Sequence, residues 1–91
     1  MSFSLDGVSV ALHEQARHDG QRITSDSWEE YPVLRFADVP RVTTELIIRP
    51  EARPLGAGEA SMAPAIAAIA GGIFSALGTR PNRLPFIPEN L

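Results

Sequence analysis

The sequence predicts an α+β fold, in which a hairpin and one main strand accompany a buried, alanine-rich helix near the C-terminus. Three observations predict it. A β-branched run bounded by prolines covers residues 42–48, and an uncharged run rich in alanine covers residues 62–77. A turn signature, Asp19-Gly20, separates two polar arms. With 91 residues, the chain forms one small domain at most.

The N-terminal segment, residues 3–12, is expected to form a short helix. Leu5, Val8 and Leu12 recur at helical spacing along it. The alternation around Val8 and Val10 also suits a strand, so both structures stay open at this point.

Residues 13–25 are expected to form a surface hairpin with polar arms. Asp19 and Gly20 suit the two central positions of a type I′ turn, which need positive φ. His13 and His18 lie in this region and resemble a zinc-protease pair, but they are five residues apart. On a helix they would point about 140° apart and could not share a face. We therefore expect two surface histidines and no metal site.

The chain's tryptophan and tyrosine lie in an expected anchor segment, residues 27–36. Pro32 biases Tyr31 toward extended geometry, so the segment is expected to be extended or a loop. Glu29 and Glu30 beside Trp28 could suggest a sugar site, but such a pair is more often a solvated turn over an aromatic anchor.

The best strand in the chain is residues 42–48, Val-Thr-Thr-Glu-Leu-Ile-Ile, which lies between Pro40 and Pro50. The tail, residues 80–91, is too rich in proline for regular structure. It is expected to run as an extended strap across a larger surface.

The predicted helix over residues 62–77 has clear end signals. Ser61 is expected to be its N-cap, Pro64 lies in the first turn, and Gly78 is the expected C-terminal stop. Large apolar residues form one face, alanine and glycine fill the others, and no face is polar. A helix that is apolar all round is buried in a large protein or inserted in a membrane.

The sequence favours neither a membrane span nor burial of this helix by the rest of the chain. The uncharged stretch barely reaches the length of a membrane span, and its alanines and glycines favour transfer into lipid only weakly. We therefore expect no membrane span. The remaining residues are too few and too polar to cover the helix on every side, so this chain is not expected to stand alone.

The loop over residues 54–60, Pro-Leu-Gly-Ala-Gly-Glu-Ala, is the best candidate for chemistry. Gly56 and Gly58 allow close approach of a ligand to the backbone. Glu59 is the one ionisable residue between Arg53 and Arg80, and an isolated carboxylate among small apolar residues is a candidate general base. A solvated loop glutamate is the alternative. The loop also imitates a dinucleotide fingerprint, but no βαβ unit surrounds it.

Composition excludes several classes of function. The net charge of −3 gives no reason to expect nucleic acid as a partner, and the arginines are scattered singly. The absence of cysteine excludes disulfides and thiolate sites. The serines lack a histidine at a convincing spacing for a hydrolase triad. The N-terminus lacks the basic and apolar regions of a secretory signal, so a cytoplasmic protein is expected, with a periplasmic protein as the alternative.

Nearly the whole chain resembles the C-terminal end of the molybdopterin-binding subunit of molybdenum hydroxylases, the xanthine dehydrogenase and aldehyde oxidase family. Residues 28–40 are most similar to the bacterial enzymes of the isoquinoline 1-oxidoreductase and nicotinate dehydrogenase type. The resemblance is carried by residues 7–14, Asp19-Gly20, residues 31–40, residues 54–60 with the helix that follows, and residues 83–85.

The resemblance implies a site and a reaction. Glu59 matches the family's Gly-x-Gly-Glu glutamate and would be the general base, while Ala57 and Gly58 would lie close to a molybdopterin-type molybdenum cofactor. The implied reaction hydroxylates an N-heterocycle or aldehyde with oxygen from water, and electrons leave through an iron–sulfur subunit. The resemblance covers only the last part of a longer polypeptide, so residues 1–91 are expected to act as one C-terminal fragment that is inactive alone.

A non-enzymatic function is the alternative to this enzymatic one. A small non-enzymatic protein could use the apolar helix over residues 62–77 to dock onto a partner or a membrane.

Overall fold

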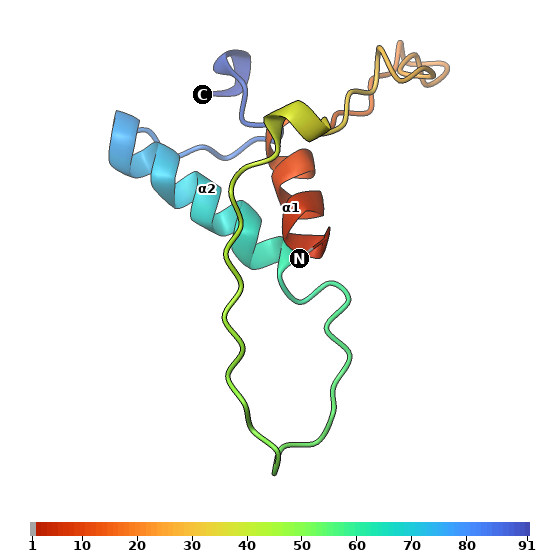
Figure 1. Ribbon diagram of the computed structural model, residues 1–91. Helices are drawn as coiled ribbons and strands as arrows, with labels where there is room; N and C mark the ends of the chain where they lie inside the picture. Colours follow the sequence, from red (N-terminus) through yellow and green to blue (C-terminus); the bar gives the residue numbers. More distant parts are fainter. Residues whose placement is uncertain (1) are drawn as a thin grey trace.

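The protein contains two helices joined by long loops in a computed structural model that describes residues 2–91 (Figure 1). Helix α1 spans Ser2–Leu12 and helix α2 spans Met62–Leu77. Two single-turn 3₁₀ helices, η1 (Phe36–Asp38) and η2 (Pro88–Asn90), lie in the central loop and in the tail. Both long helices lie where the sequence places a helix, and α2 has the predicted bounds.

Helix α1 is the centre of the molecule, although it is short. Of the residues whose burial is described, four are buried, and three of these are small residues of α1: Gly7, Ser9 and Ala11. The fourth is Pro85 in the tail. A different segment of the chain meets α1 at each of the three small residues.

Gly7 is the point where α1 meets the start of α2. A Cβ at Gly7 would lie 2.8 Å from the Met62 carbonyl oxygen and 3.1 Å from the Ala65 Cβ. The first of these distances is shorter than any ordinary contact, so only glycine lets the two backbones approach this closely. The crossing therefore depends on the missing side chain.

Ser9 joins α1 to the segment that carries the tyrosine. Its Oγ accepts a hydrogen bond from the Leu34 N–H at 2.9 Å and donates one to Glu14 Oε1 at 2.6 Å. The hydroxyl of Tyr31 donates to the other oxygen of Glu14, Oε2, at 2.8 Å. We call Ser9, Glu14 and Tyr31 the polar clasp. Trp28, expected to anchor the same segment, is instead 77% exposed.

Ala11 receives the tail, because its carbonyl oxygen accepts a hydrogen bond from the Phe86 N–H at 2.6 Å. The side-chain amide of Asn90 donates to the Pro85 carbonyl at 2.9 Å and so folds the last residues back on the strap. The tail thus forms neither a strand nor an α-helix, as its prolines predict, but it is not the extended strap that we expected, because η2 adds a helical turn and Asn90 folds back on Pro85.

The two ends of α2 differ in how well the sequence predicts them. Gly78 has φ of 71° and donates its N–H to the Phe74 carbonyl at 2.8 Å, which is the expected C-terminal stop. Ser61 occupies the N-cap position as predicted, but its side chain makes no capping hydrogen bond. Its φ of −93° and ψ of −9° are already helical, whereas a capping side chain needs extended backbone.

The predicted hairpin is present as a single pair of residues. His18 and Ile23 form an antiparallel β-bridge. Beside it, the Thr24 N–H donates to the Arg17 carbonyl at 2.9 Å. The hairpin therefore lies within residues 13–25 as expected, although its paired part is short.

The turn of this hairpin differs from the prediction. Gly20 has φ of 94°, and no residue other than glycine has positive φ in the described chain. The predicted type I′ turn, which needs positive φ at both Asp19 and Gly20, is therefore wrong. Oδ1 of Asp19 instead accepts hydrogen bonds from the N–H groups of Gln21 and Arg22 at 2.9 and 3.0 Å.

The predicted main strand, residues 42–48, runs extended without a partner. Across residues 2–91, the His18–Ile23 bridge is isolated and no strand ladder forms. The limb that follows contains Pro50, Pro54 and two glycines. Prolines lack the N–H that a ladder needs and glycines disfavour strands, so this limb does not pair with residues 42–48.

The predicted burial of α2 is not achieved within this chain. None of its residues is buried; Phe74 is 42% exposed and Leu77 is 62% exposed. Arg80 lies over the Phe74 ring at 4.8 Å and covers part of one end. The radius of gyration is 16.1 Å, against about 12 Å for a compact chain of this length. The chain is thus too open to enclose its most apolar element.

Adding one methyl group at the helix crossing tests its role. Gly7→Ala is expected to destabilise the α1–α2 packing by about 1–3 kcal/mol, because the Met62 backbone must move. Gly71→Ala is the matched control, since a Cβ there meets nothing within 4 Å and alanine favours the helix. Urea titration followed by circular dichroism compares the two. Equal or higher stability of Gly7→Ala would contradict a backbone-limited crossing.

The polar clasp makes a prediction about the chain's single tyrosine. The hydrogen bond to the Glu14 carboxylate raises the pKa of Tyr31 above its usual value of about 10. Its stabilising effect is therefore full below pH of about 10 and is lost as the pH rises through the higher folded-state pKa. Glu14→Gln is expected to return the tyrosinate absorbance titration toward the usual value, and Glu30→Gln to leave it unchanged. No change with Glu14→Gln would exclude the clasp.

Candidate functional site

The candidate loop, residues 54–60, lies on a long excursion of the chain that we call the arm, residues 40–61. In Figure 1 the arm descends from η1, turns at its far end and returns to the start of α2. Both ends lie against α1: Val39 lines a hollow with Leu5 and Asp6, and Met62 lies at Gly7. The candidate loop forms the returning limb.

Glu59 lies at the last turn before α2. Its carbonyl oxygen accepts a hydrogen bond from the Met62 N–H at 3.1 Å, so the chain turns directly into the helix. Its carboxylate is exposed and makes no hydrogen bond or ion pair with any described residue. The free N–H groups at a helix N-terminus carry partial positive charge. The position therefore presents an uncommitted carboxylate to a ligand, beside the positive end of a helix.

The glycines of the loop provide access rather than unusual backbone angles. Neither Gly56 nor Gly58 has positive φ, and a Cβ at Gly56 would meet nothing within 4 Å. Within the described chain, no hydrogen bond uses the N–H groups of residues 55–59. Ala57 thus presents only a methyl group, Gly58 has no side chain, and both offer unpaired N–H donors to any group that approaches.

These residues fit one wall of a cofactor site and not a whole site. The loop has the small residues and free N–H groups that would let a large anionic group approach closely. It lacks a cavity, since every residue from 54 to 60 is exposed. Nowhere in the described residues do three or more His, Cys, Asp or Glu gather as metal ligands. Any cofactor would therefore need most of its contacts from other polypeptide.

The two histidines occupy different structures. His13 follows the last turn of α1 and donates its N–H to the Ser9 carbonyl, while His18 lies in the hairpin bridge. Nδ1 of His18 accepts a hydrogen bond from the Gly20 N–H at 3.3 Å. They share no helix face, in agreement with the spacing argument.

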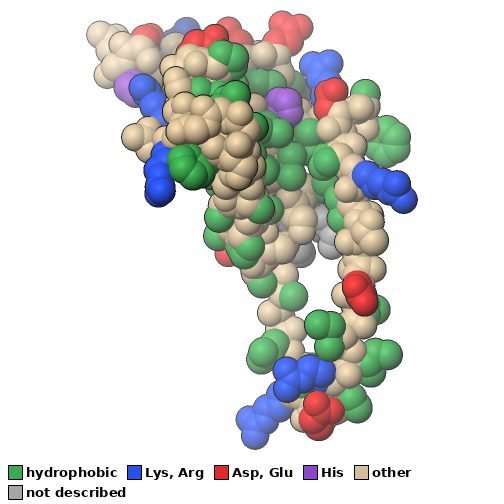
Figure 2. Space-filling model, turned by 90° about the vertical axis from the view of Figure 1, so that its left-hand side faces the viewer, with side chains coloured by type: hydrophobic (Ala, Val, Ile, Leu, Met, Phe, Trp, Pro, Cys, Tyr) green, Lys and Arg blue, Asp and Glu red, His purple; other side chains and the backbone are tan. Residues whose placement is uncertain are grey.

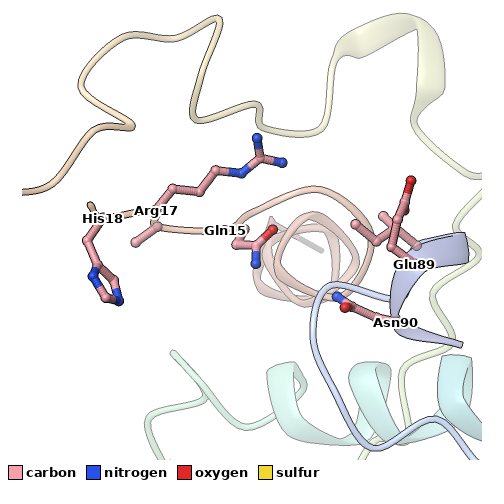
Figure 3. Close-up of a pocket in the computed structure, with 7 residues that line it drawn as sticks. Gln15, Arg17, His18, Glu89 and Asn90 are labelled. Atoms are coloured by element: carbon pink, nitrogen blue, oxygen red, sulfur yellow. The ribbon is translucent and has the colours of Figure 1, made fainter. Parts of the chain in front are cut away.

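A shallow hollow lies between the hairpin and the tail (Figure 3). Arg17 and His18 reach it from one side, and Glu89 and Asn90 from the other. No hydrogen bond or ion pair within the described chain joins the two sides, and Asn90 is already bonded to the Pro85 carbonyl. The hollow is open and holds no buried charged group, so it has no feature of a catalytic site.

The other sites considered from the sequence, a sugar site and a dinucleotide-binding unit, also lack the structure that they need. Trp28, Tyr31 and the serines near them line a second open hollow, but Tyr31 is engaged by Glu14 and the tryptophan is exposed. Residues 56–61 follow no strand, so a dinucleotide-binding unit is absent from the described chain. Helix α2 is also too short to cross a membrane, as is the other described helix.

The sequence reasoning missed the polar clasp. Ser9, Glu14 and Tyr31 are its members, and the tyrosine is seventeen residues from the glutamate. Neither composition nor periodicity links residues at that distance. No histidine shares these hydrogen bonds, and the serine hydroxyl already donates to Glu14. The clasp therefore holds two segments together and has no free nucleophile.

Comparison with known proteins gives one informative similarity. Over 87 residues, or 96% of its length, the chain is 33% identical to a nicotinate dehydrogenase subunit of Pseudomonas putida. The chain spans only 7% of that protein's length. No protein-family model matches the chain, and no solved structure does. This chain is therefore similar, along nearly all of its own length, to a small part of a dehydrogenase subunit.

Proposed function

We propose that this chain is the C-terminal part of the molybdopterin-binding subunit of a molybdenum-dependent hydroxylase. The observation that carries the proposal is the similarity to the Pseudomonas putida nicotinate dehydrogenase subunit, which runs through the candidate loop and both helices. The substrate class is an N-heterocycle or an aldehyde, and water supplies the oxygen. An iron–sulfur subunit is the proposed partner that receives the electrons.

Glu59 is the proposed general base. Its carboxylate would accept the proton of the attacking water, which raises the nucleophilicity of the oxygen. The molybdenum cofactor, when bound, supplies oxygen activation and accepts the electron pair. The exposed position of Glu59 before α2 supports this role, because nothing in the described chain competes for its carboxylate.

Ala57 and Gly58 are the proposed cofactor contacts. Their N–H groups are unpaired within the described chain, and neither residue has a side chain larger than a methyl group to block close approach. No metal ligand is proposed from this chain. The remainder of the longer polypeptide would supply the pterin pocket, the substrate pocket and the cover for α2.

A second candidate is a non-enzymatic protein that docks through α2. The exposure of Phe74 and Leu77 on an uncharged helix favours it. A free-standing module of this kind should be monodisperse and melt cooperatively, whereas part of a larger protein should aggregate or stay partly folded without its complement.

The catalytic proposal is tested in Pseudomonas putida nicotinate dehydrogenase that carries this chain in place of the 87 residues that match it. Glu59→Gln is expected to lower turnover by on the order of 10²–10⁴-fold, because the amide cannot accept the proton. Turnover is measured as nicotinate-dependent reduction of a dye. Metal analysis checks that both proteins hold equal cofactor.

Glu51→Gln is the matched control for that experiment. Glu51 lies on the same arm and, among the described residues, pairs only with Arg49, at 3.5 Å on the surface. Its loss is expected to leave turnover within about twofold. If Glu59→Gln retained the turnover of the unaltered chain, Glu59 would not be the base.

A further inference from the structure

The arm carries a strand pattern that this chain does not use. Even-numbered residues from 42 to 48 are Val42, Thr44, Leu46 and Ile48, whereas odd-numbered residues from 41 to 49 include both flanking arginines and Glu45. Side chains of a strand alternate between two faces, so the even residues form one apolar face and the odd residues a largely charged one. This is the pattern of a strand with one buried and one solvated face.

That apolar face is uncovered. Leu46 is 84% exposed and Ile48 is 86% exposed, and Figure 2 shows the arm projecting from the body with its hydrophobic and charged side chains open to solvent. Within the described chain, no hydrogen bond uses the N–H or C=O groups of residues 41–48. Both edges of the segment are therefore free to pair.

The chain's own returning limb cannot supply the partner strand. Pro50 and Pro54 lack N–H groups, and Gly56 and Gly58 disfavour extended pairing. An extended apolar segment with two open edges is a template for pairing with another polypeptide. The partner strand must then come from outside residues 40–61.

A second copy of this chain is a poor partner because of one charge. Antiparallel pairing that aligns residues 42–48 over their full length sets Glu45 directly opposite Glu45, and parallel pairing in register does the same. Like charges at directly opposed positions destabilise a sheet. The Pseudomonas putida relative offers a different source, since the 87 matched residues are only 7% of its length.

We propose that residues 42–48 add as a strand to an open sheet edge in the remainder of the longer polypeptide. Val42, Thr44, Leu46 and Ile48 would face the apolar layer beneath that sheet. This inference rests on the proposed function and deepens it, because it names the surface through which the chain joins the rest of the enzyme. Docking the strand also fixes the limb that carries Glu59, whose other end is held at the Gly7 crossing.

The test supplies the tagged full chain in trans to the Pseudomonas putida nicotinate dehydrogenase subunit from which the matching 87 residues have been deleted. Thr43→Pro and Thr44→Pro each remove one N–H, and successive N–H groups point to opposite edges of a strand. At least one of them is expected to lower, by about tenfold, the recovery of the truncated protein with the tagged chain. Thr43→Ala and Thr44→Ala keep the N–H groups and should retain recovery within about twofold.

Circular dichroism of the chain alone controls for folding. Residues 43 and 44 are exposed and make no hydrogen bond within the described chain, so the proline variants should keep the helical signal. Equal recovery with the proline and alanine variants would overturn the proposal, as would failure of the unaltered chain to recover the truncated protein. A dimer of the chain alone that the prolines dissolve would assign the strand to a second copy and overturn it too.

The variant Glu59→Gln separates this inference from the catalytic one. It is expected to recover the truncated protein to the same extent as the unaltered chain, because its side chain lies eleven residues beyond Ile48. Full recovery with unchanged turnover would remove the catalytic role of Glu59 and leave the docking strand in place. Loss of recovery in the proline variants alone supports the strand.

Discussion

Three small residues of α1 let other segments come close to this helix, and the arrangement of the whole molecule follows from these contacts. Gly7 admits the backbone of α2, the Ser9 hydroxyl binds the Leu34 N–H, and the Ala11 carbonyl binds the tail. At Gly7 even a Cβ would lie 2.8 Å from the Met62 carbonyl oxygen, so a side chain there would force the α2 backbone away. A helix of eleven residues thereby organises a chain in which almost no hydrophobic residue of described burial is buried.

This arrangement explains why the candidate site lies outside the body of the molecule. The arm begins and ends on α1, so its base is fixed while its residues remain exposed. Glu59 is held near the fixed end, at the turn into α2. Within the described chain, Glu59 has no pocket around its carboxylate. A carboxylate at the start of a helix is suited to complete a site whose other walls lie outside residues 1–91.

Two exposed apolar surfaces also indicate that this chain makes contacts with protein outside residues 1–91. Helix α2 is uncharged and has no buried residue, and the extended segment 42–48 has an apolar face and two unpaired edges. Burying apolar area is the main favourable term in folding, and this chain leaves much of it unused. The similarity to 7% of a much longer dehydrogenase subunit accounts for both surfaces with one proposal.

Features that depend on neighbours along the chain could be predicted without the fold. The bounds of α2, the left-handed Gly78, the irregular tail and the identity of Glu59 as an isolated carboxylate follow from local pattern. The Gly7 crossing and the Glu14–Tyr31 hydrogen bond could not be predicted, because they join residues that are distant in sequence. In the folded chain the hairpin turn is not type I′, the Ser61 side chain makes no capping hydrogen bond, and residues 42–48 have no partner strand among the described residues. Strand pairing requires a partner at the right place in space, and residue preferences alone cannot supply one.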